Sequence, residues 1–168
     1  MIKKLNYYFI TLFIFGDSIE KYRGTWASLS TTLFLFLLIH GFKIPIIIIF
    51  LSLLLILFYS FFAINSCLHD FKDDDPQEIV IDEFLGQSLP IFLLYYPIQK
   101  GDPESAWVYL IMCFILFRFF DILKPFPINL VDKKIKNGFG VVLDDLLAGV
   151  YVLIAIALFG HFFGPPFE

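Results

Sequence analysis

Two pairs of carboxylates stand where the chain turns from polar to strongly apolar. Asp82 and Glu83 immediately precede one apolar run, and Asp144 and Asp145 immediately precede another. Adjacent carboxylates repel each other, so two such pairs at the mouths of apolar helices favour a bound cation. Their oxygens are hard ligands of the kind that Mg²⁺ prefers. The alternative for Asp82 and Glu83 is that they only stabilise a helix N-terminus, which is a common arrangement.

Basic residues occur where such a site could hold a phosphate. Arg118 and Asp121 are three residues apart at the end of an apolar helix, and Lys124 follows one turn later. Ionisable groups at membrane depth are costly and tend to be functional; the alternative is a structural Arg118–Asp121 ion pair with a snorkelling Lys124. The segment 21–28 places Gly24 at a helix start, whose free N–H groups attract anions. Its alternative is a simple helix cap at the membrane surface.

These groups together suit phosphoryl transfer. A metal ion and the basic side chains would neutralise the phosphate oxygens while a nucleophile attacks in line. The sequence holds no GxSxG, P-loop, HExxH or GxGxxG motif that would indicate another chemistry. Cys67 and Cys113 lie in or beside apolar runs and lack a plausible His partner, so we expect no thiol catalysis, disulfide or thiolate metal site.

The segments that position these groups are long and apolar. Hydrophobic residues make up 59% of the 168-residue chain, and the mean hydropathy is +0.82; soluble domains lie at roughly 45–50% apolar. A bilayer core takes roughly 20 helical residues. We therefore predict one membrane-embedded all-α domain, residues 1–168, with five transmembrane helices (four as the alternative) and a short N-terminal interfacial helix. The interfacial run is Leu5–Phe15, and the others are Trp26–Ile39, Ile44–Ile64, Phe84–Pro97, Ala106–Leu123 and Leu146–Phe163.

Charged residues divide unevenly between the two sides that a five-helix path defines. One side receives ten of the twelve Lys and Arg residues, and the other receives only Lys43 and Lys100. By the positive-inside rule, the first side is cytoplasmic. Thirteen of the sixteen acidic residues fall on this side as well, which the rule does not require, so we expect the chemistry to face the cytoplasm. The net charge of −4 argues against nucleic acid as a partner.

Four motifs, in this order, resemble the phosphatidylglycerophosphatase A family of bacterial membrane lipid phosphatases. The resemblance runs from about residue 16 to 163, and its motifs are Gly24–Leu29 (GTWASL), Ile81–Gly86 (IDEFLG), Phe117–Ile128 (FRFFDILKPFPI) and Gly138–Gly149 (GFGVVLDDLLAG). Arg23 stands where family members often have Pro, and Ala27 where they often have Gly. Neither departure removes a catalytic type of group. The longer aspartate pattern of the CDP-alcohol phosphatidyltransferases is absent.

The resemblance implies Mg²⁺-dependent hydrolysis of phosphatidylglycerophosphate to phosphatidylglycerol and phosphate, in phospholipid biosynthesis at the bacterial cytoplasmic (inner) membrane. It also implies a helical fold with a central helix surrounded by others. Whether water or an aspartate attacks stays open; Asp121 is the candidate for a covalent step, and Asn129 and Asp132 would lie farther out. The expected site residues are the metal ligands Asp82, Glu83, Asp121, Asp144 and Asp145, the catalytic residues Asp121, Asp145 and Glu83, and the phosphate-binding residues Gly24, Thr25, Ser28, Arg118 and Lys124.

Two other functions stay open at this point. The first is the same chemistry on another membrane lipid phosphate. The second is a small cation transporter or channel subunit that uses the inner acids as an ion site. A transporter should place ionisable residues near the middle of the membrane, with broken helices there, whereas these acids stand at the ends of the apolar runs.

Overall fold

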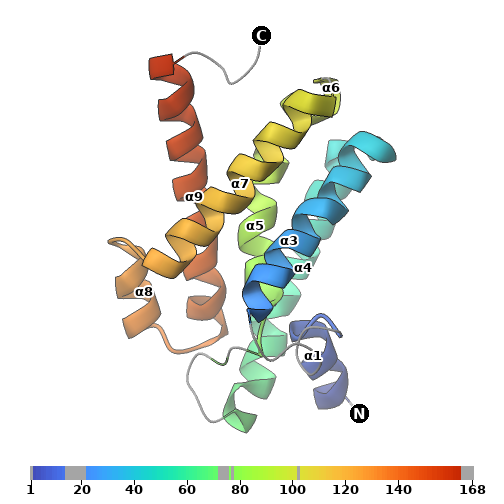
Figure 1. The fold of residues 1–168 in the computed structure, drawn as a ribbon. Helices are drawn as coiled ribbons and strands as arrows, with labels where there is room; N and C mark the ends of the chain where they lie inside the picture. The colour runs from blue at the N-terminus through green and yellow to red at the C-terminus, as the bar shows by residue number, and fades with distance from the viewer. Residues whose placement is uncertain (1, 14–21, 72–75, 77, 102, 164–168) are drawn as a thin grey trace.

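The chain folds into a bundle of helices. The computed structural model describes residues 2–13, 22–71, 76, 78–101 and 103–163, and this part of the chain contains helices and no strand (Figure 1). Lys21 and residues 14–15 of the predicted interfacial run lie outside the described residues. The elements are α1 (Ile2–Ile10), α3 (Arg23–Phe36) with a π-helical extension η1 (Leu37–Gly41), α4 (Ile46–Cys67), the 3₁₀ turn η2 (Leu68–Asp70), α5 (Ile81–Leu93), α6 (Tyr95–Lys100), α7 (Pro103–Leu123), α8 (Ile128–Lys134) and α9 (Gly138–Phe163).

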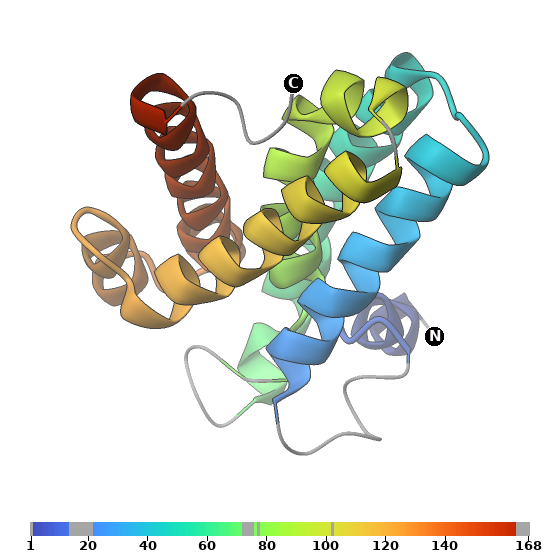
Figure 2. The same cartoon turned by 45° about the horizontal axis from the view of Figure 1, so that its top comes forward.

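Helix α5 occupies the centre of the bundle. It packs against α3, α4, α7 and α9, and Figures 1 and 2 show these four helices arranged around it. Eight of its thirteen residues are buried. The expectation of a central helix surrounded by others is therefore confirmed.

In the part of the chain that the structure describes, four helices are long and apolar enough to cross a membrane: Arg23–Gly41, Ile46–Asp70, Glu104–Leu123 and Gly138–Phe162. Much of their apolar surface faces outward; on α4, for example, Leu55 and Phe58 are 71% and 64% exposed. Water would penalise such a surface, while lipid tails solvate it. The chain is therefore a membrane protein. Helix α3 begins at Arg23, three residues before the predicted apolar run Trp26–Ile39.

The remaining predicted crossing, Phe84–Pro97, is not one continuous helix. Helix α5 ends at Leu93, and α6 begins after a break at Leu94. The ring of Pro97 would clash with the carbonyl group of Leu93, four residues earlier, if the helix ran on. As two pieces, α5 and α6 still traverse the bundle from the end that holds α1 to the end where α3 meets α4 (Figure 1). The four continuous helices match the lower of the two predicted counts, and this broken pair accounts for the fifth.

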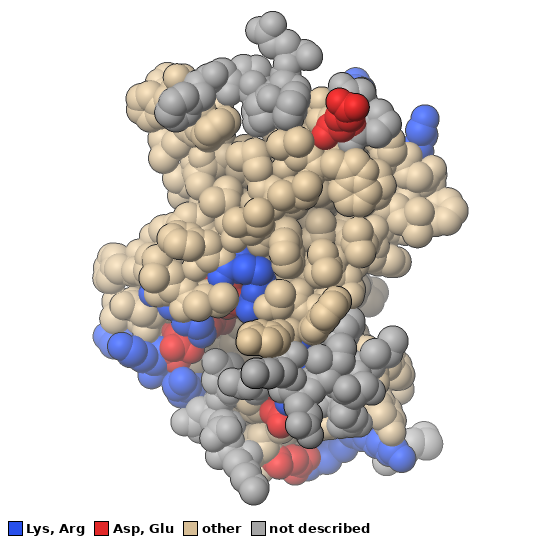
Figure 3. Space-filling view, in the orientation of Figure 1, with Lys and Arg blue, Asp and Glu red and all other residues tan. Residues whose placement is uncertain are grey.

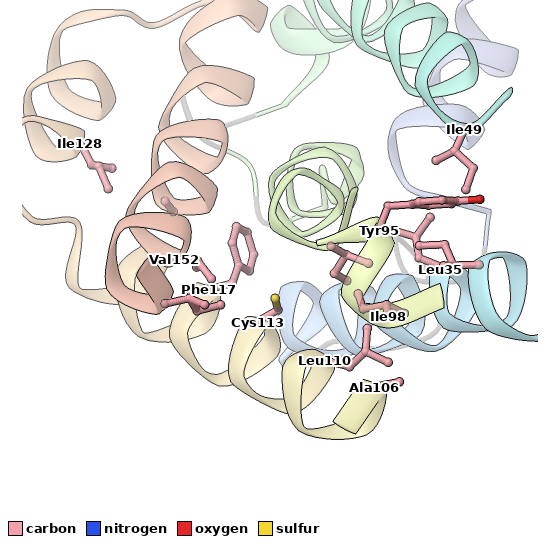
Figure 4. Packing of buried hydrophobic residues seen from close by; sticks show 14 residues of the cluster. Leu35, Ile49, Tyr95, Ile98, Ala106, Leu110, Cys113, Phe117, Ile128 and Val152 are labelled. Carbon is pink, nitrogen blue, oxygen red and sulfur yellow. The ribbon is translucent and has the colours of Figure 1, made fainter. Parts of the chain in front are cut away.

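Two clusters of buried apolar side chains hold the helices together. In the larger one, residues such as Leu35 of α3, Ile98 of α6, Phe117 of α7 and Val152 of α9 converge around α5 (Figure 4). The smaller one joins α1, α4 and the first turns of α5 and α9. It therefore lies at the end of the bundle where α5 and α9 begin.

Charged side chains are concentrated at that same end. In Figure 3 a broad uncharged band separates a few charges at the top of the molecule from many at the bottom, and a small basic and acidic patch shows in a hollow between them. An uncharged band of this kind is what a bilayer core requires. The one-sided charge read from the sequence is thus visible in the folded chain.

Candidate active site

Acidic residues from three helices meet at this end of the bundle. Asp82 and Glu83 lie in the first turn of α5, Asp144 and Asp145 in the second turn of α9, and Asp121 in the last turn of α7. They line one cavity of about 100 Å³, and the described residues that line it are Pro76, Ile79, Asp82, Glu83, Asp121, Lys124, Asp144 and Asp145. All five predicted metal ligands and one predicted phosphate ligand therefore share a cavity.

A close crossing of α5 and α9 brings the two acidic pairs together. A Cβ atom on Gly86 would lie only 2.7 Å from the carbonyl oxygen of Asp145, and one on Gly149 only 2.6 Å from the carbonyl oxygen of Gly86. No larger residue fits at either position without moving a backbone. The two glycines thus let the helices touch one turn from the acids.

Three of the carboxylates form a group that could hold a metal ion. Asp82, Glu83 and Asp145 each offer one oxygen, and these oxygens lie within 4.8 Å of one another. Within the described part of the chain, Glu83 Oε2 and Asp145 Oδ2 are buried and accept no hydrogen bond. Buried acceptors normally have partners, and clustered carboxylates repel. A divalent cation would remove both costs, and an all-oxygen donor set suits Mg²⁺.

The other two carboxylates pair with basic side chains. Lys124 Nζ lies 2.7 Å from Asp144 Oδ2 and 2.9 Å from Asp132 Oδ1, so it joins α9 to α8. Its backbone lies in the left-handed region, with φ of 42°, a conformation that ends α7 and is rare outside glycine. Residues held in such conformations cluster at functional sites.

Arg118 connects the acids to the start of α3. Its Nη1 lies 2.6 Å from Asp121 Oδ2, the ion pair that the sequence analysis gave as the alternative to a functional role, so the roles expected for Arg118 and Asp121 stay predictions. A Cβ atom on Gly24 would overlap Glu83 Oε1 and lie 3.1 Å from Arg118 Nη1. The first turn of α3, with its free N–H groups, is therefore packed directly against Glu83 and the Arg118 guanidinium group. A helix start and a guanidinium group both commonly bind phosphate, but neither Gly24 nor Arg118 is among the residues that line the cavity, so the phosphate-binding role expected for them stays a prediction.

Thr25 and Ser28 are not among the residues that line the cavity. Ser28 is buried, and its hydroxyl group donates a hydrogen bond to the carbonyl oxygen of Gly24 at 2.8 Å. The hydroxyl proton of Ser28 is thus already donated to a hydrogen bond within α3. The phosphate-binding role expected for these two hydroxyl groups stays a prediction.

Gln87 is a polar residue near the site that the sequence analysis did not single out. Its side chain is fully buried, and neither amide atom has a hydrogen-bond partner in the part of the chain that the structure describes. It stands four residues after Glu83, one turn farther along α5, so the two side chains share a face. A Gln inside an apolar helix, one turn beyond an acidic pair, was the signal available in the sequence.

Comparisons with known proteins agree on one family. The family model described as phosphatidylglycerophosphatase A matches residues 8–160. A Haemophilus influenzae protein named phosphatidylglycerophosphatase A is 38% identical over 133 residues, which cover 79% of this chain and 76% of the relative. An Escherichia coli protein of the same name is 32% identical over 87 residues, or 52% of this chain and 46% of the relative.

One further relative carries a different name. A Bacteroides thetaiotaomicron protein, named provisionally as a phosphatidylinositol-3-phosphatase, is 42% identical over 85 residues, which cover 51% of this chain and 49% of the relative. The matches to this protein and to the Escherichia coli protein thus span about half of each relative. No solved structure matches the chain.

Proposed function

The chain belongs to the phosphatidylglycerophosphatase A family of phosphatases, and on this basis we propose that it hydrolyses the phosphomonoester of phosphatidylglycerophosphate with the help of Mg²⁺. The products are phosphatidylglycerol and phosphate, as phospholipid biosynthesis requires. The observation that carries the proposal is the group formed by Asp82, Glu83 and Asp145. It lies in one cavity with Lys124, and Glu83 is packed against Arg118 and the start of α3.

In this proposal Asp82, Glu83 and Asp145 hold the metal ion, with Asp121 and Asp144 completing its surroundings. Bound Mg²⁺ would supply positive charge beside the phosphate oxygens. Arg118 and Lys124 supply further positive charge and hydrogen-bond donors from the protein itself. The N–H groups at the start of α3 orient the phosphate from a third direction.

The reaction breaks the bond between phosphorus and the glycerol oxygen and forms one between phosphorus and the attacking oxygen. The glycerol oxygen leaves with a proton as the free hydroxyl group of phosphatidylglycerol. A carboxylate in the cavity could take the proton from an attacking water; in the covalent alternative, Asp121 attacks first and water then releases the phosphate. Both routes use the same positive surroundings to stabilise the transition state.

The membrane arrangement suits a lipid substrate. The acids stand at the starts of α5 and α9 and at the end of α7, while the outward-facing apolar residues of the spans would contact lipid tails. A phospholipid could thus keep its tails in the bilayer while its headgroup reaches the cavity. We propose that this end of the bundle faces the cytoplasm of a bacterium.

Another lipid phosphate is the second candidate substrate, because the Bacteroides thetaiotaomicron relative is named for a phosphoinositide. Purified protein in detergent would be given phosphatidylglycerophosphate, phosphatidylinositol 3-phosphate, phosphatidic acid or a soluble phosphomonoester, each with Mg²⁺ or with a chelator. We expect Mg²⁺-dependent phosphate release that is fastest from phosphatidylglycerophosphate. Faster release from phosphatidylinositol 3-phosphate would make this phosphoinositide the preferred substrate. No phosphate release from any of the four compounds would reject the phosphatase function.

A further inference from the structure

We propose that the N-terminal helix α1 is a positioning element of the active site, a role that rests on the proposed phosphatase function. In this proposal Ile10 fixes the start of α5, which carries Asp82 and Glu83, and Asn6 fixes α1 itself against α4. The helix is too short to span a bilayer, and the sequence had suggested only that it lies at the membrane interface.

The first link is a hydrogen bond between backbones. The N–H group of Val80 donates to the carbonyl oxygen of Ile10 at 2.9 Å. Val80 is the residue immediately before α5 and stands two residues before Asp82. Among the described residues, no side chain makes a capping hydrogen bond at this end of α5. The hydrogen bond from Val80 to α1 therefore fixes the start of the helix where a cap often does so.

The second link is apolar packing at the same place. Ile10 is fully buried in the smaller cluster, where it is grouped with Ile79 and Ile81 on either side of Val80. The same cluster contains Val141 and Val142 of α9, which precede Asp144 and Asp145. One buried side chain of α1 thus belongs to the cluster that joins both acid-bearing helix starts.

The third link anchors α1 to α4. Asn6 is fully buried; its Nδ2 donates to Ser66 Oγ at 2.7 Å, and its Oδ1 accepts from the hydroxyl group of Tyr59 at 2.6 Å. Asn6 and Ile10 are four residues apart and therefore share a face of the helix. The contacts of Asn6 thus fix the rotation that keeps Ile10 turned toward the cluster.

Loss of this anchor should loosen the acids without dismantling the bundle. The four candidate spans do not include α1, and the main packing of α1 on another helix is with α4. The family match begins at residue 8, so Asn6 lies outside it. Freed from α1, the start of α5 should open locally more often, because local stability depends on such contacts.

Hydrogen exchange in the metal-free protein tests this directly. Asn6→Leu removes both side-chain hydrogen bonds, and Tyr59→Phe removes one while keeping the ring. We expect Asn6→Leu, which loses two buried hydrogen bonds, to speed amide exchange of residues 79–84 roughly tenfold. Tyr59→Phe loses one of them and should speed this exchange roughly fivefold. Exchange in the middle of α7 should not change. Lys3→Ala, also on α1, is the matched control, because the contact of Lys3 with Asp70 of η2 is exposed.

The Mg²⁺ requirement of phosphate release gives the functional readout. Asn6→Leu should raise the half-saturating Mg²⁺ concentration roughly tenfold while the KM for lipid stays near the wild-type value. Wild-type exchange at residues 79–84 in both variants would overturn the role of α1, as would a fall in thermal stability with an unchanged Mg²⁺ requirement. If Asn6→Leu does not fold, Tyr59→Phe decides alone. A wild-type protein that releases no phosphate would reject the phosphatase function instead, and the exchange data would still decide whether α1 fixes α5.

Discussion

At the scale of single residues, Lys124 joins three helices. Its side chain leaves the end of α7 and contacts Asp144 of α9 and Asp132 of α8. The Asp144 side chain is only 6% exposed, so its charge depends on a nearby positive group. A buried carboxylate that loses such a partner keeps the cost of its desolvation.

Lys124→Met should therefore lower both stability and activity. Met keeps the length and apolar stem of the side chain but removes its charge, so we expect a loss of about 2 kcal/mol in the free energy of unfolding. Phosphate release should fall at least about 100-fold, since a positive group beside the phosphate is lost. Thermal unfolding and phosphate release measure the two effects. Lys133→Met, on the exposed face of α8, is the control, and equal behaviour of the two variants would contradict this role.

The residue types and the local pairs of the site could be predicted from sequence. The spacing of Arg118 and Asp121 indicated that they are neighbours, because residues three apart on a helix share a face, and their ion pair was the alternative that the sequence left open. The partners of Lys124 lie 8 and 20 residues away, beyond the reach of helix periodicity. Their pairing depends on the left-handed turn at Lys124 and on the place of α8, which only the folded chain reveals.

At the scale of elements, the crossing of α5 and α9 sets the distance between the two acidic pairs. Gly86 meets backbone and Cβ atoms of Asp145 as well as the ring of Phe117. A backbone atom cannot rotate away as a flexible side chain can. A methyl group at Gly86 must therefore push the two helices apart.

Gly86→Ala should destabilise the protein by about 2 kcal/mol through overpacking and should reduce phosphate release at least about tenfold, because Asp82 and Asp145 are displaced from each other. Gly160→Ala on α9 is the matched control: nothing lies within 4 Å of its added Cβ. There Ala should be neutral or stabilising by up to about 1 kcal/mol, because it favours helix over Gly. A Gly86→Ala protein with wild-type stability and activity would show that the crossing tolerates separation.

The sequence did not predict the form of the central helix. The run Phe84–Pro97 was predicted to be one crossing because most of its residues are apolar, in spite of Gln87 and Ser88. The break at Leu94 follows from the steric effect of Pro97 on the carbonyl group four residues earlier, a local effect that hydropathy does not register.

At the scale of the whole molecule, the distribution of charge predicts the orientation in the membrane. Lys136→Cys should react with a membrane-impermeant maleimide in inside-out vesicles, and Lys100→Cys should react only in right-side-out cells. Both positions are exposed. The native Cys67 and Cys113 are 2% and 0% exposed and should stay unlabelled. The reverse labelling pattern would place the site on the outer face.

Composition and hydropathy were sufficient to predict a helical membrane protein, because a surface this apolar is stable only in lipid. They did not show which helix is central. Of the predicted crossings, the segment containing α5 was among the shortest and most interrupted, yet it is the one buried by its neighbours. Which helix is enclosed depends on packing between segments far apart in sequence, and a single sequence carries little record of it.

The central claim is that Asp82, Glu83 and Asp145 form a cation site on which phosphate hydrolysis depends. The most direct test is a Mg²⁺ titration of phosphate release from phosphatidylglycerophosphate by chelator-treated wild-type protein and by Asp145→Asn. We predict that Mg²⁺ restores the wild-type rate and that Asp145→Asn, although folded, stays at least about 1,000-fold slower at every Mg²⁺ concentration. Metal-independent release by the wild type, or wild-type rates in Asp145→Asn, would contradict the claim.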